Sequence, residues 1–185
     1  ELRDGYFNAA WRIDLHDGRC AVLKVAPPPD VTVLHYERGI MATEVEVLRR
    51  VAGETSVPVP TVYYYDQSHT LLDSDYFLME WVAGEAYHKL REGFSAEQRD
   101  AIDAAIGGSL AQINALTGTY FGYMALPVQR FGTWREAFLG MFRDLLADGQ
   151  ARHVALPIPY AGLLAQVEAA APVLDEVQTP HLVHW

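Results

Sequence analysis

The sequence predicts an α+β protein with a strand-rich first part and a helical second part. Before about residue 82, apolar residues alternate with polar ones around Trp11, and tyrosine, valine and phenylalanine predominate in the segments 61–66 and 76–82. After about residue 95, apolar residues recur at spacings of three and four behind two capping sequences. Strands followed by helices are typical of α+β proteins or of two lobes. We therefore expect a first lobe at 1–82, a linker at 83–94 and a helical lobe at 95–185.

The first two expected strands form a hairpin. Trp11, Ile13 and Leu15 alternate with polar residues, which is the period of a half-buried strand. Asp17-Gly18 is predicted to make a two-residue turn into a second strand at 20–25. The run of three prolines after that strand ends it, because proline cannot continue a hydrogen-bonded ladder.

One helix and two more strands complete the first part. The helix is expected at about 38–52, and Val57-Pro-Val-Pro60 follows as an extended segment because each proline biases its predecessor away from helix. Strands are expected at 61–66 and 76–82, where β-branched and aromatic residues are frequent. The polar residues 67–75 are expected to connect them.

Three helices are expected in the second part. Ser95 with Gln98, and Thr133 with Glu136, form capping boxes, and Pro159 suits the first turn of a third helix. The last residues, 179–185, are predicted to be extended. The apolar stripes of the three helices are Ile102, Ile106, Leu110, Ile113 and Leu116; Trp134, Phe138, Met141 and Leu145; and Leu163, Val167 and Ala171.

The composition limits the classes of function. The net charge of the 185 residues is −10, which repels phosphate backbones and anionic lipids. We expect no nucleic-acid or membrane partner, and a cationic small substrate is favoured. Cys20 is the single cysteine, which excludes an intrachain disulfide and a four-cysteine zinc site. No apolar stretch approaches the roughly 20 residues of a membrane span, and no signal peptide is recognisable, so a cytosolic location is expected.

A lysine and a glutamate stand out against their apolar surroundings. Lys24 lies inside an apolar strand on the face of Val22, either as a solvated residue of an edge strand or as a cation aimed at phosphate oxygens. On a helical wheel of 38–52, Glu44 falls within the apolar arc and Glu46 on the opposite side. A carboxylate on a core-facing stripe is costly without a cation, which makes Lys24 its predicted partner. Glu37 is the alternative partner, if the helix runs back through Gly39.

Two other segments are compatible with a nucleotide. A strand ends at Val82 before the glycine-containing link, and a flat base could hydrogen-bond to the backbone of 80–82 there. The turn Asp4-Gly-Tyr-Phe-Asn8 could lay backbone N–H groups over phosphates. The absence of a G-x-x-x-x-G-K-[ST] sequence excludes a Walker-type site.

The order of these features resembles the amino-terminal lobe of kinase-like folds, and in detail the aminoglycoside phosphotransferase and choline kinase family. Gly5-Tyr-Phe-Asn8 resembles the nucleotide loop of that family, and Val57-Pro-Val-Pro60 is one of its markers. Leu182-Val-His184 matches the strand that leads into its His-x-Asp catalytic loop. The resemblance covers essentially the whole chain and implies a two-lobed protein-kinase-like fold whose helical lobe is incomplete.

The resemblance also implies roles for individual residues in binding ATP. Lys24 would hold the α- and β-phosphates and Glu44 would fix Lys24, while Gly5 to Asn8 would cover the phosphates. The adenine pocket would be formed by Met79 at its back and by the backbones of Glu80 and Val82.

The sequence departs from the family pattern in three ways. Asn114 stands where many members have histidine, and the chain begins too late to include the first strand. It ends at Trp185, where the family's catalytic aspartate would be the next residue and its Mg²⁺-binding residues would lie further on. His184 is implied to be a structural residue of that loop, so we expect no catalytic residue and no metal ligand within the chain. A metal site at His181 and His184 is disfavoured, because strand residues three apart point to opposite faces.

We therefore expect an ATP- and Mg²⁺-dependent phosphotransferase that moves the γ-phosphate to a hydroxyl of a small molecule. An aminoglycoside or amino sugar is the first candidate substrate, followed by choline-like, fructosamine-like or other alcohols. A nucleotide-binding pseudokinase without turnover and a purely structural α+β domain are the alternatives. The oligomeric state is not predicted.

Overall fold

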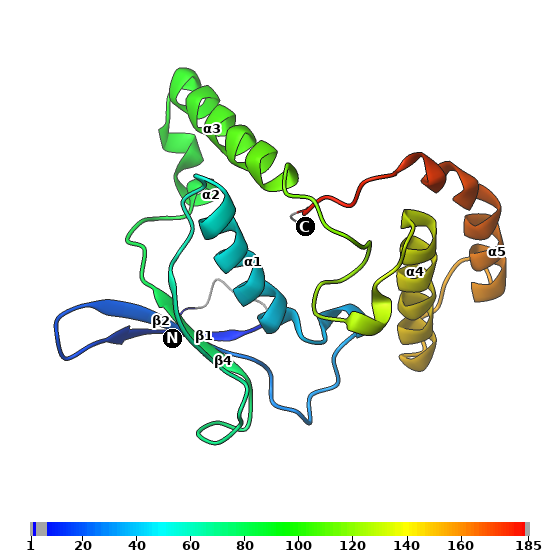
Figure 1. The fold of residues 1–185 in the computed structure, drawn as a ribbon, viewed down its shortest axis with the longest axis horizontal. Helices are drawn as coiled ribbons and strands as arrows, with labels where there is room; N and C mark the ends of the chain where they lie inside the picture. Colours follow the sequence, from blue (N-terminus) through cyan, green and yellow to red (C-terminus); the bar gives the residue numbers. More distant parts are fainter. Residues whose placement is uncertain (1, 3–6, 184–185) are drawn as a thin grey trace. The chain divides into compact units, whose positions relative to one another are not determined.

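The computed structural model describes residue 2 and residues 7–183 and shows a mixed α and β architecture (Figure 1). Its described strands form one antiparallel sheet in the order β1-β2-β4-β3. The strands are β1 (Ala9–Asp14), β2 (Cys20–Val25), β3 (Val62–Asp66) and β4 (Tyr76–Glu80). Strands precede most of the helices along the chain, so the predicted α+β class is confirmed.

The turn between β1 and β2 is longer than predicted. Leu15 and Arg19 are joined by a backbone hydrogen bond of 2.8 Å, which leaves three residues in the loop. Gly18 has a φ of +85° and donates its N–H to the carbonyl of Leu15. A type I turn followed by a left-handed glycine is the usual geometry of a three-residue hairpin loop. The expectation of a two-residue turn at Asp17-Gly18 is therefore wrong.

The helix that follows β2 begins two residues later than expected. It is α1 (Ile40–Glu54), preceded by the short helix η1 (His35–Glu37). Gly39 between them has a φ of +67°, a left-handed conformation that a right-handed helix cannot include. Within α1, Met41, Val45 and Val51 are buried as the wheel predicts, whereas Ala52 is exposed.

The chain folds into two compact units. One, called here the sheet unit, comprises 1–31, 44–116 and 183–185, and the other, the helical unit, comprises 32–43 and 117–182. The described core of the sheet unit contains the fully buried Phe77, Val45 and Val51. The division into lobes at 1–82, 83–94 and 95–185 stays a prediction. The two compact units are defined by contacts within the chain, whereas the predicted lobes are defined by function.

The sheet unit also contains α2 (Tyr87–Leu90), η2 (Arg91–Gly93) and α3 (Ala96–Asn114). The predicted capping box is present, since Gln98 N–H donates to Ser95 Oγ and Ser95 N–H donates to Gln98 Oε1. Gln112 Oε1 accepts hydrogen bonds from the backbone N–H and the hydroxyl of Ser56, which ties α3 to the segment after α1. No residue of α3 is buried, and its stripe residues Ile106 and Leu110 are exposed.

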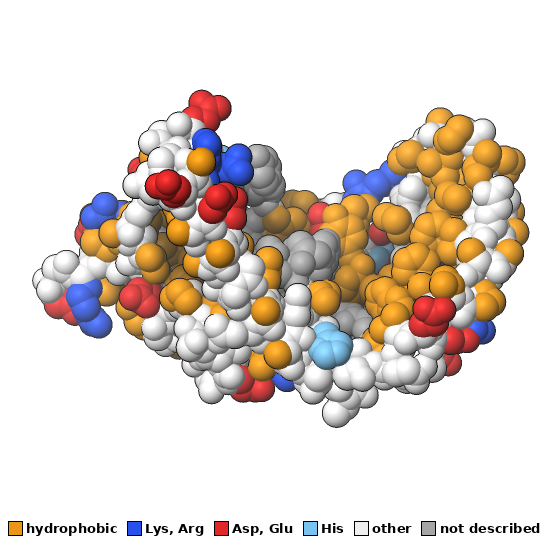
Figure 2. Space-filling view, turned by 90° about the horizontal axis from the view of Figure 1, so that it is seen from above, with side chains coloured by type: hydrophobic (Ala, Val, Ile, Leu, Met, Phe, Trp, Pro, Cys, Tyr) orange, Lys and Arg blue, Asp and Glu red, His pale blue; other side chains and the backbone are white. Residues whose placement is uncertain are grey.

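The helical unit is organised around α4 (Trp134–Ala151), which contacts η1 and three other elements. These are η3 (Pro127–Gln129), α5 (Tyr160–Ala170) and η4 (Ala171–Glu176). The predicted capping box of Thr133 and Glu136 is present. The buried face of α4 differs from the expected stripe, because Leu146 is buried and Leu145 is exposed. Hydrophobic side chains are visible over α4 and α5 (Figure 2).

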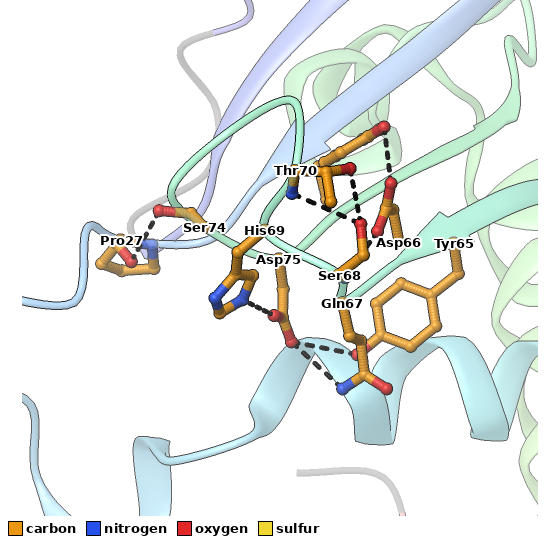
Figure 3. A network of polar contacts seen from close by, with 10 residues as sticks. Pro27, Tyr65, Asp66, Gln67, Ser68, His69, Thr70, Ser74 and Asp75 are labelled. Atoms are coloured by element: carbon orange, nitrogen blue, oxygen red, sulfur yellow. Dashed lines mark hydrogen bonds and ion pairs between the residues drawn. The ribbon is translucent and has the colours of Figure 1, made fainter.

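A polar network organises the β3–β4 hairpin (Figure 3). Asp66 accepts hydrogen bonds from the Ser68 N–H at 2.6 Å and from the hydroxyls of Tyr76 and Tyr64. Asp75 accepts from Tyr65, Gln67 and His69, whose Nε2 lies 2.7 Å from Oδ1. Because both carboxylates bond to side chains or backbone of the same hairpin, they fix the conformation of the long loop 67–75.

Candidate functional site

The predicted site residues that the structure describes all belong to the sheet unit. Lys24 lies in β2 opposite Phe77 of β4, and Val22 lies opposite Met79. Because directly paired residues of antiparallel strands share a face, Lys24, Val22, Phe77 and Met79 form one row on the same side of the sheet. The Lys24 side chain is therefore not on the open face of an edge strand; β2 is an interior strand with β1 and β4 on either side.

Lys24 and Glu44 form an ion pair. The Nζ atom of Lys24 lies 2.5 Å from Oε1 of Glu44, and the two side chains are 22% and 31% exposed. The ammonium group also lies 5.7 Å from the centre of the buried Phe77 ring. A partly desolvated pair with a short charge-assisted hydrogen bond holds the lysine in one direction more firmly than solvent would. Glu46 is exposed, on the opposite side of α1 as the helical wheel places it.

The structure gives Glu37 a different partner. Glu37 lies in η1, and its Oε2 accepts a hydrogen bond of 2.7 Å from the backbone N–H of Leu34. The left-handed conformation of Gly39 separates η1 from α1, so Glu37 and Glu44 do not lie on one continuous helical face. Glu44 is the carboxylate that meets Lys24.

At the end of β4, Glu80 is held by hydrogen bonds and Val82 is exposed to solvent. The Glu80 N–H donates to the carbonyl of Thr61 at 2.8 Å, and its carboxylate accepts from the Thr61 N–H at 3.1 Å. These bonds secure the last residue of β4 against the segment that enters β3. Val82, two residues further on, is exposed. The segment after β4 therefore starts from a fixed point and presents an exposed residue, which is compatible with backbone recognition of a flat ligand.

Sequence reasoning missed one contact at this end of β4. The Arg12 guanidinium lies 5.2 Å from the centre of the Trp81 ring and pairs with Asp14 at 3.0 Å. Its Nη2 atom also lies 3.2 Å from the sulfur of Cys20. Alternation placed Arg12 on the face opposite Trp11 and Ile13, but the contact with Trp81 depends on the pairing of β2 with both β1 and β4, which a single strand pattern does not reveal.

The nucleotide-loop residues are only partly covered. Gly5 of the expected nucleotide loop and His184 of the expected catalytic loop both lie outside the described residues. Asn8 is described, and its Oδ1 is buried without a hydrogen-bond partner among the described residues. No group of three or more His, Cys, Asp or Glu side chains in residue 2 and 7–183 is arranged to hold a metal ion.

A part-buried lysine fixed by a glutamate fits the phosphates of a nucleotide, since a long cationic side chain is the usual ligand for them. A sequence profile described as the phosphotransferase enzyme family matches residues 1–184. The chain belongs to this family. A search of curated protein sequences finds no significant match.

Solved structures similar to this family member have the same fold. A candidate fructosamine-3-kinase from Thermobifida fusca YX-ER1 matches with a TM-score of 0.61 and 22% identity over 98% of this chain. A candidate aminoglycoside phosphotransferase from Ralstonia eutropha JMP134 matches with a TM-score of 0.55 and 16% identity over 100% of this chain. This chain spans 58% and 57% of those two structures. The expected family and kinase-like fold are confirmed.

Within residue 2 and residues 7–183, no helix combines the length and the apolar composition that crossing a membrane requires.

Proposed function

We propose that this chain binds ATP and forms part of a kinase that transfers the γ-phosphate to a hydroxyl group of a small molecule. The observation that carries the proposal is the Lys24–Glu44 ion pair, part-buried on the sheet face that also carries Met79. Family membership supports the reaction class. Lys24 would contact the α- and β-phosphates, and the backbones of Glu80 and Val82 would bind adenine.

In phosphoryl transfer, the protein mainly positions the reacting groups and stabilises the phosphate charge, because the reaction needs little covalent participation by side chains. Glu44 keeps the Lys24 ammonium from turning toward solvent, so the cation is already placed when the nucleotide arrives. Gly5 to Asn8 would cover the phosphates. When bound, Mg²⁺ supplies further neutralisation of the phosphate charge. The lobe boundaries at 1–82, 83–94 and 95–185 belong to the same proposal.

An aminoglycoside or another amino sugar is our first candidate substrate. The net charge of −10 favours a cationic acceptor, and one similar structure is described as a candidate aminoglycoside phosphotransferase. A fructosamine-like acceptor is the second candidate, because another similar structure is described as a candidate fructosamine-3-kinase. A choline-like or other alcohol is the third.

Nucleotide binding is the first experiment. The melting temperature of the protein is measured with ATP and Mg²⁺, with Mg²⁺ alone and with GTP at equal ionic strength. Ligand at 100 times its dissociation constant stabilises a folded protein by about 2.7 kcal/mol, enough for a shift of several degrees. No shift with any nucleotide would favour a purely structural domain.

Turnover separates the kinase from a pseudokinase. The full-length protein is incubated with ATP and Mg²⁺ and with amino sugars, fructosamines or choline-like alcohols in turn, and ADP formation is measured. Acceptor-dependent ADP formation supports the kinase. Nucleotide binding without ADP formation for any acceptor would favour the nucleotide-binding pseudokinase.

A further inference from the structure

A stacked arginine and tryptophan lie at one end of the sheet face that carries Lys24. Arg12 of β1 pairs with Val22 of β2, which in turn pairs with Met79 of β4. Because directly paired residues share a face, Arg12 lies on the face of Lys24. Its guanidinium covers the Trp81 ring, with 5.2 Å between its central carbon and the ring centre. All of these residues belong to the sheet unit.

The register of the sheet decides which end of this face Arg12 occupies. Lys24 lies opposite Phe77. Ala21, three residues earlier in β2, lies opposite Glu80, the last residue of β4. Moving from Lys24 toward the start of β2 therefore leads to the end of β4, and Arg12 lies on that side of the lysine. In the proposed function, Lys24 takes the phosphates and the backbone of Glu80 takes the base. Arg12 is thus at the base end of the face.

A carboxylate already neutralises the Arg12 guanidinium. Oδ1 of Asp14 lies 3.2 Å from Nε and 3.0 Å from Nη2 of Arg12, and Nη2 also donates to the Cys20 sulfur at 3.2 Å. A phosphate group would have to compete with Asp14 and would be repelled by it. A neutral, flat base meets no such repulsion, and the guanidinium plane stacks well on flat π systems. The chemistry of this group therefore favours the base of a nucleotide over its phosphates.

We propose that Arg12, stacked on Trp81, is a specificity-determining residue that contacts the flat face of the base of the bound nucleotide. The Arg12 side chain is 49% exposed although the indole covers one face of its guanidinium, so the opposite face is accessible to a ligand. Trp81 lies between Glu80 and Val82 in the chain, so a base held by the backbones of those two residues lies beside the stack. The inference rests on the proposed function and adds a surface that recognises the base.

Arg19 provides a matched control for Arg12. It pairs with an aspartate two residues away, Asp17, at 2.8 Å, just as Arg12 pairs with Asp14. Arg19 lies in the turn between β1 and β2, outside the strands that form the face, and its side chain is 70% exposed. Replacing it removes the same charge from the same hairpin without disturbing the stack on Trp81.

The test compares the binding of ATP with that of inorganic tripolyphosphate, which lacks the base. Arg12→Gln and Arg19→Gln are compared with wild type in the full-length protein by calorimetry in the presence of Mg²⁺. We expect Arg12→Gln to weaken ATP binding about threefold to tenfold, as the loss of one cation–π or stacking contact would do, and to leave tripolyphosphate binding unchanged. Arg19→Gln should leave the binding of both ligands unchanged.

Arg12→Lys separates the flat plane of the group from its charge. Lysine keeps a cation for Asp14 but has no plane to stack on a base, so this variant should bind ATP as weakly as Arg12→Gln. Full ATP affinity in Arg12→Lys would contradict a role for the guanidinium plane. Unchanged ATP affinity in Arg12→Gln would overturn the proposal, and so would an equal loss for ATP and tripolyphosphate, which would mean that the arginine acts on the phosphates through its charge.

Amide hydrogen exchange tests whether Arg12 acts on the base directly or through the backbone of β4. Measured without nucleotide, the protection of residues 77–82 should be the same in Arg12→Gln and in wild type. Faster exchange in the variant would make Arg12 a support of that backbone and would rule out the proposed contact. If wild-type protein binds no ATP, the proposed function fails and the role of Arg12 with it. If wild type and Arg12→Gln bind ATP equally well, only the role of Arg12 fails.

Discussion

The ammonium group of Lys24 in β2 lies 2.5 Å from the carboxylate of Glu44 in α1, although 20 residues separate them in sequence. The contact joins an interior strand to a helix that carries its own buried apolar face. A pair of this kind contributes little to stability, since both groups give up part of their hydration to form it. We therefore expect the pair to contribute little to stability, and the role that we propose for it is to hold the lysine for a nucleotide.

Removing either member of the pair should weaken nucleotide binding. Lys24→Ala removes the cation and Glu44→Gln frees it to turn away, so we expect losses of about tenfold or more in ATP affinity. Titration calorimetry with ATP and Mg²⁺ measures both. Glu46→Ala, on the exposed side of the same helix, is the control and should bind ATP like wild type. Equal losses from Glu44 and Glu46 would remove the reason to assign the pair a role.

Substitution of Gly39 should destabilise the protein, whereas substitution of a glycine in the interior of a helix should not. Gly39→Ala places a side chain at a φ of +67° and 3.0 Å from Ala125, so we expect destabilisation of about 1–2 kcal/mol. Gly107→Ala, in the middle of α3 with nothing within 4 Å of its Cβ position, should stabilise by up to about 1 kcal/mol. Urea unfolding measures both free energies. The same sign for the two variants would show that backbone conformation does not govern Gly39.

Asp66 should make the protein sensitive to acid. Hydrogen bonds from the side chain and the backbone N–H of Ser68, outweighing the opposing effect of burial and helped by Tyr76 and Tyr64, lower the pKa of Asp66 to about 2 from 3.8. A lowered carboxylate pKa contributes stability that is present above the unfolded pKa and is lost as the pH falls through the folded one. We therefore expect this contribution to disappear between about pH 4 and pH 2.

The acid dependence can be assigned by substitution. In Asp66→Asn, chemical denaturation followed from pH 6 to pH 2 should show a shallower acid decline than in wild type. Asp73→Asn changes an exposed carboxylate in the same loop and serves as the control. An identical decline in Asp66→Asn and wild type would mean that the hairpin network makes no contribution in this range.

Phe77 should be among the most costly residues to truncate. It is 0% exposed at the centre of the sheet, and its ring lies beside the Lys24 ammonium. Phe77→Ala leaves a cavity and should cost about 3–5 kcal/mol in the free energy of unfolding. Val128→Ala, at a side chain that is 89% exposed, should change it by less than about 0.5 kcal/mol. Comparable effects of the two changes would contradict the burial of Phe77.

Several elements could be predicted from the sequence because they depend on interactions between residues close together in the chain. The capping boxes at Ser95 and Thr133 each act within four residues, so their side chains and backbone N–H groups meet whatever the rest of the chain does. The alternation around Trp11 and the inward position of Glu44 likewise follow from the period of one strand and one helix. The prediction that an inward Glu44 needs a cation used only helix geometry and the cost of burying a charge.

Other features were decided by contacts between distant segments. Whether α1 runs back to Glu37 depends on Gly39, whose left-handed conformation lies against Ala125, and no local pattern shows that approach. The bond between His35 and Asp148 joins residues 113 positions apart, so neither residue carries a signal in its own neighbourhood. Residue period and local hydrogen bonding thus determined from sequence the alternation of the first strand, the inward position of Glu44 and the starts of two helices. Only the tertiary structure decided where α1 begins and which side chains of the later helices are buried, because both depend on close packing of segments distant in sequence.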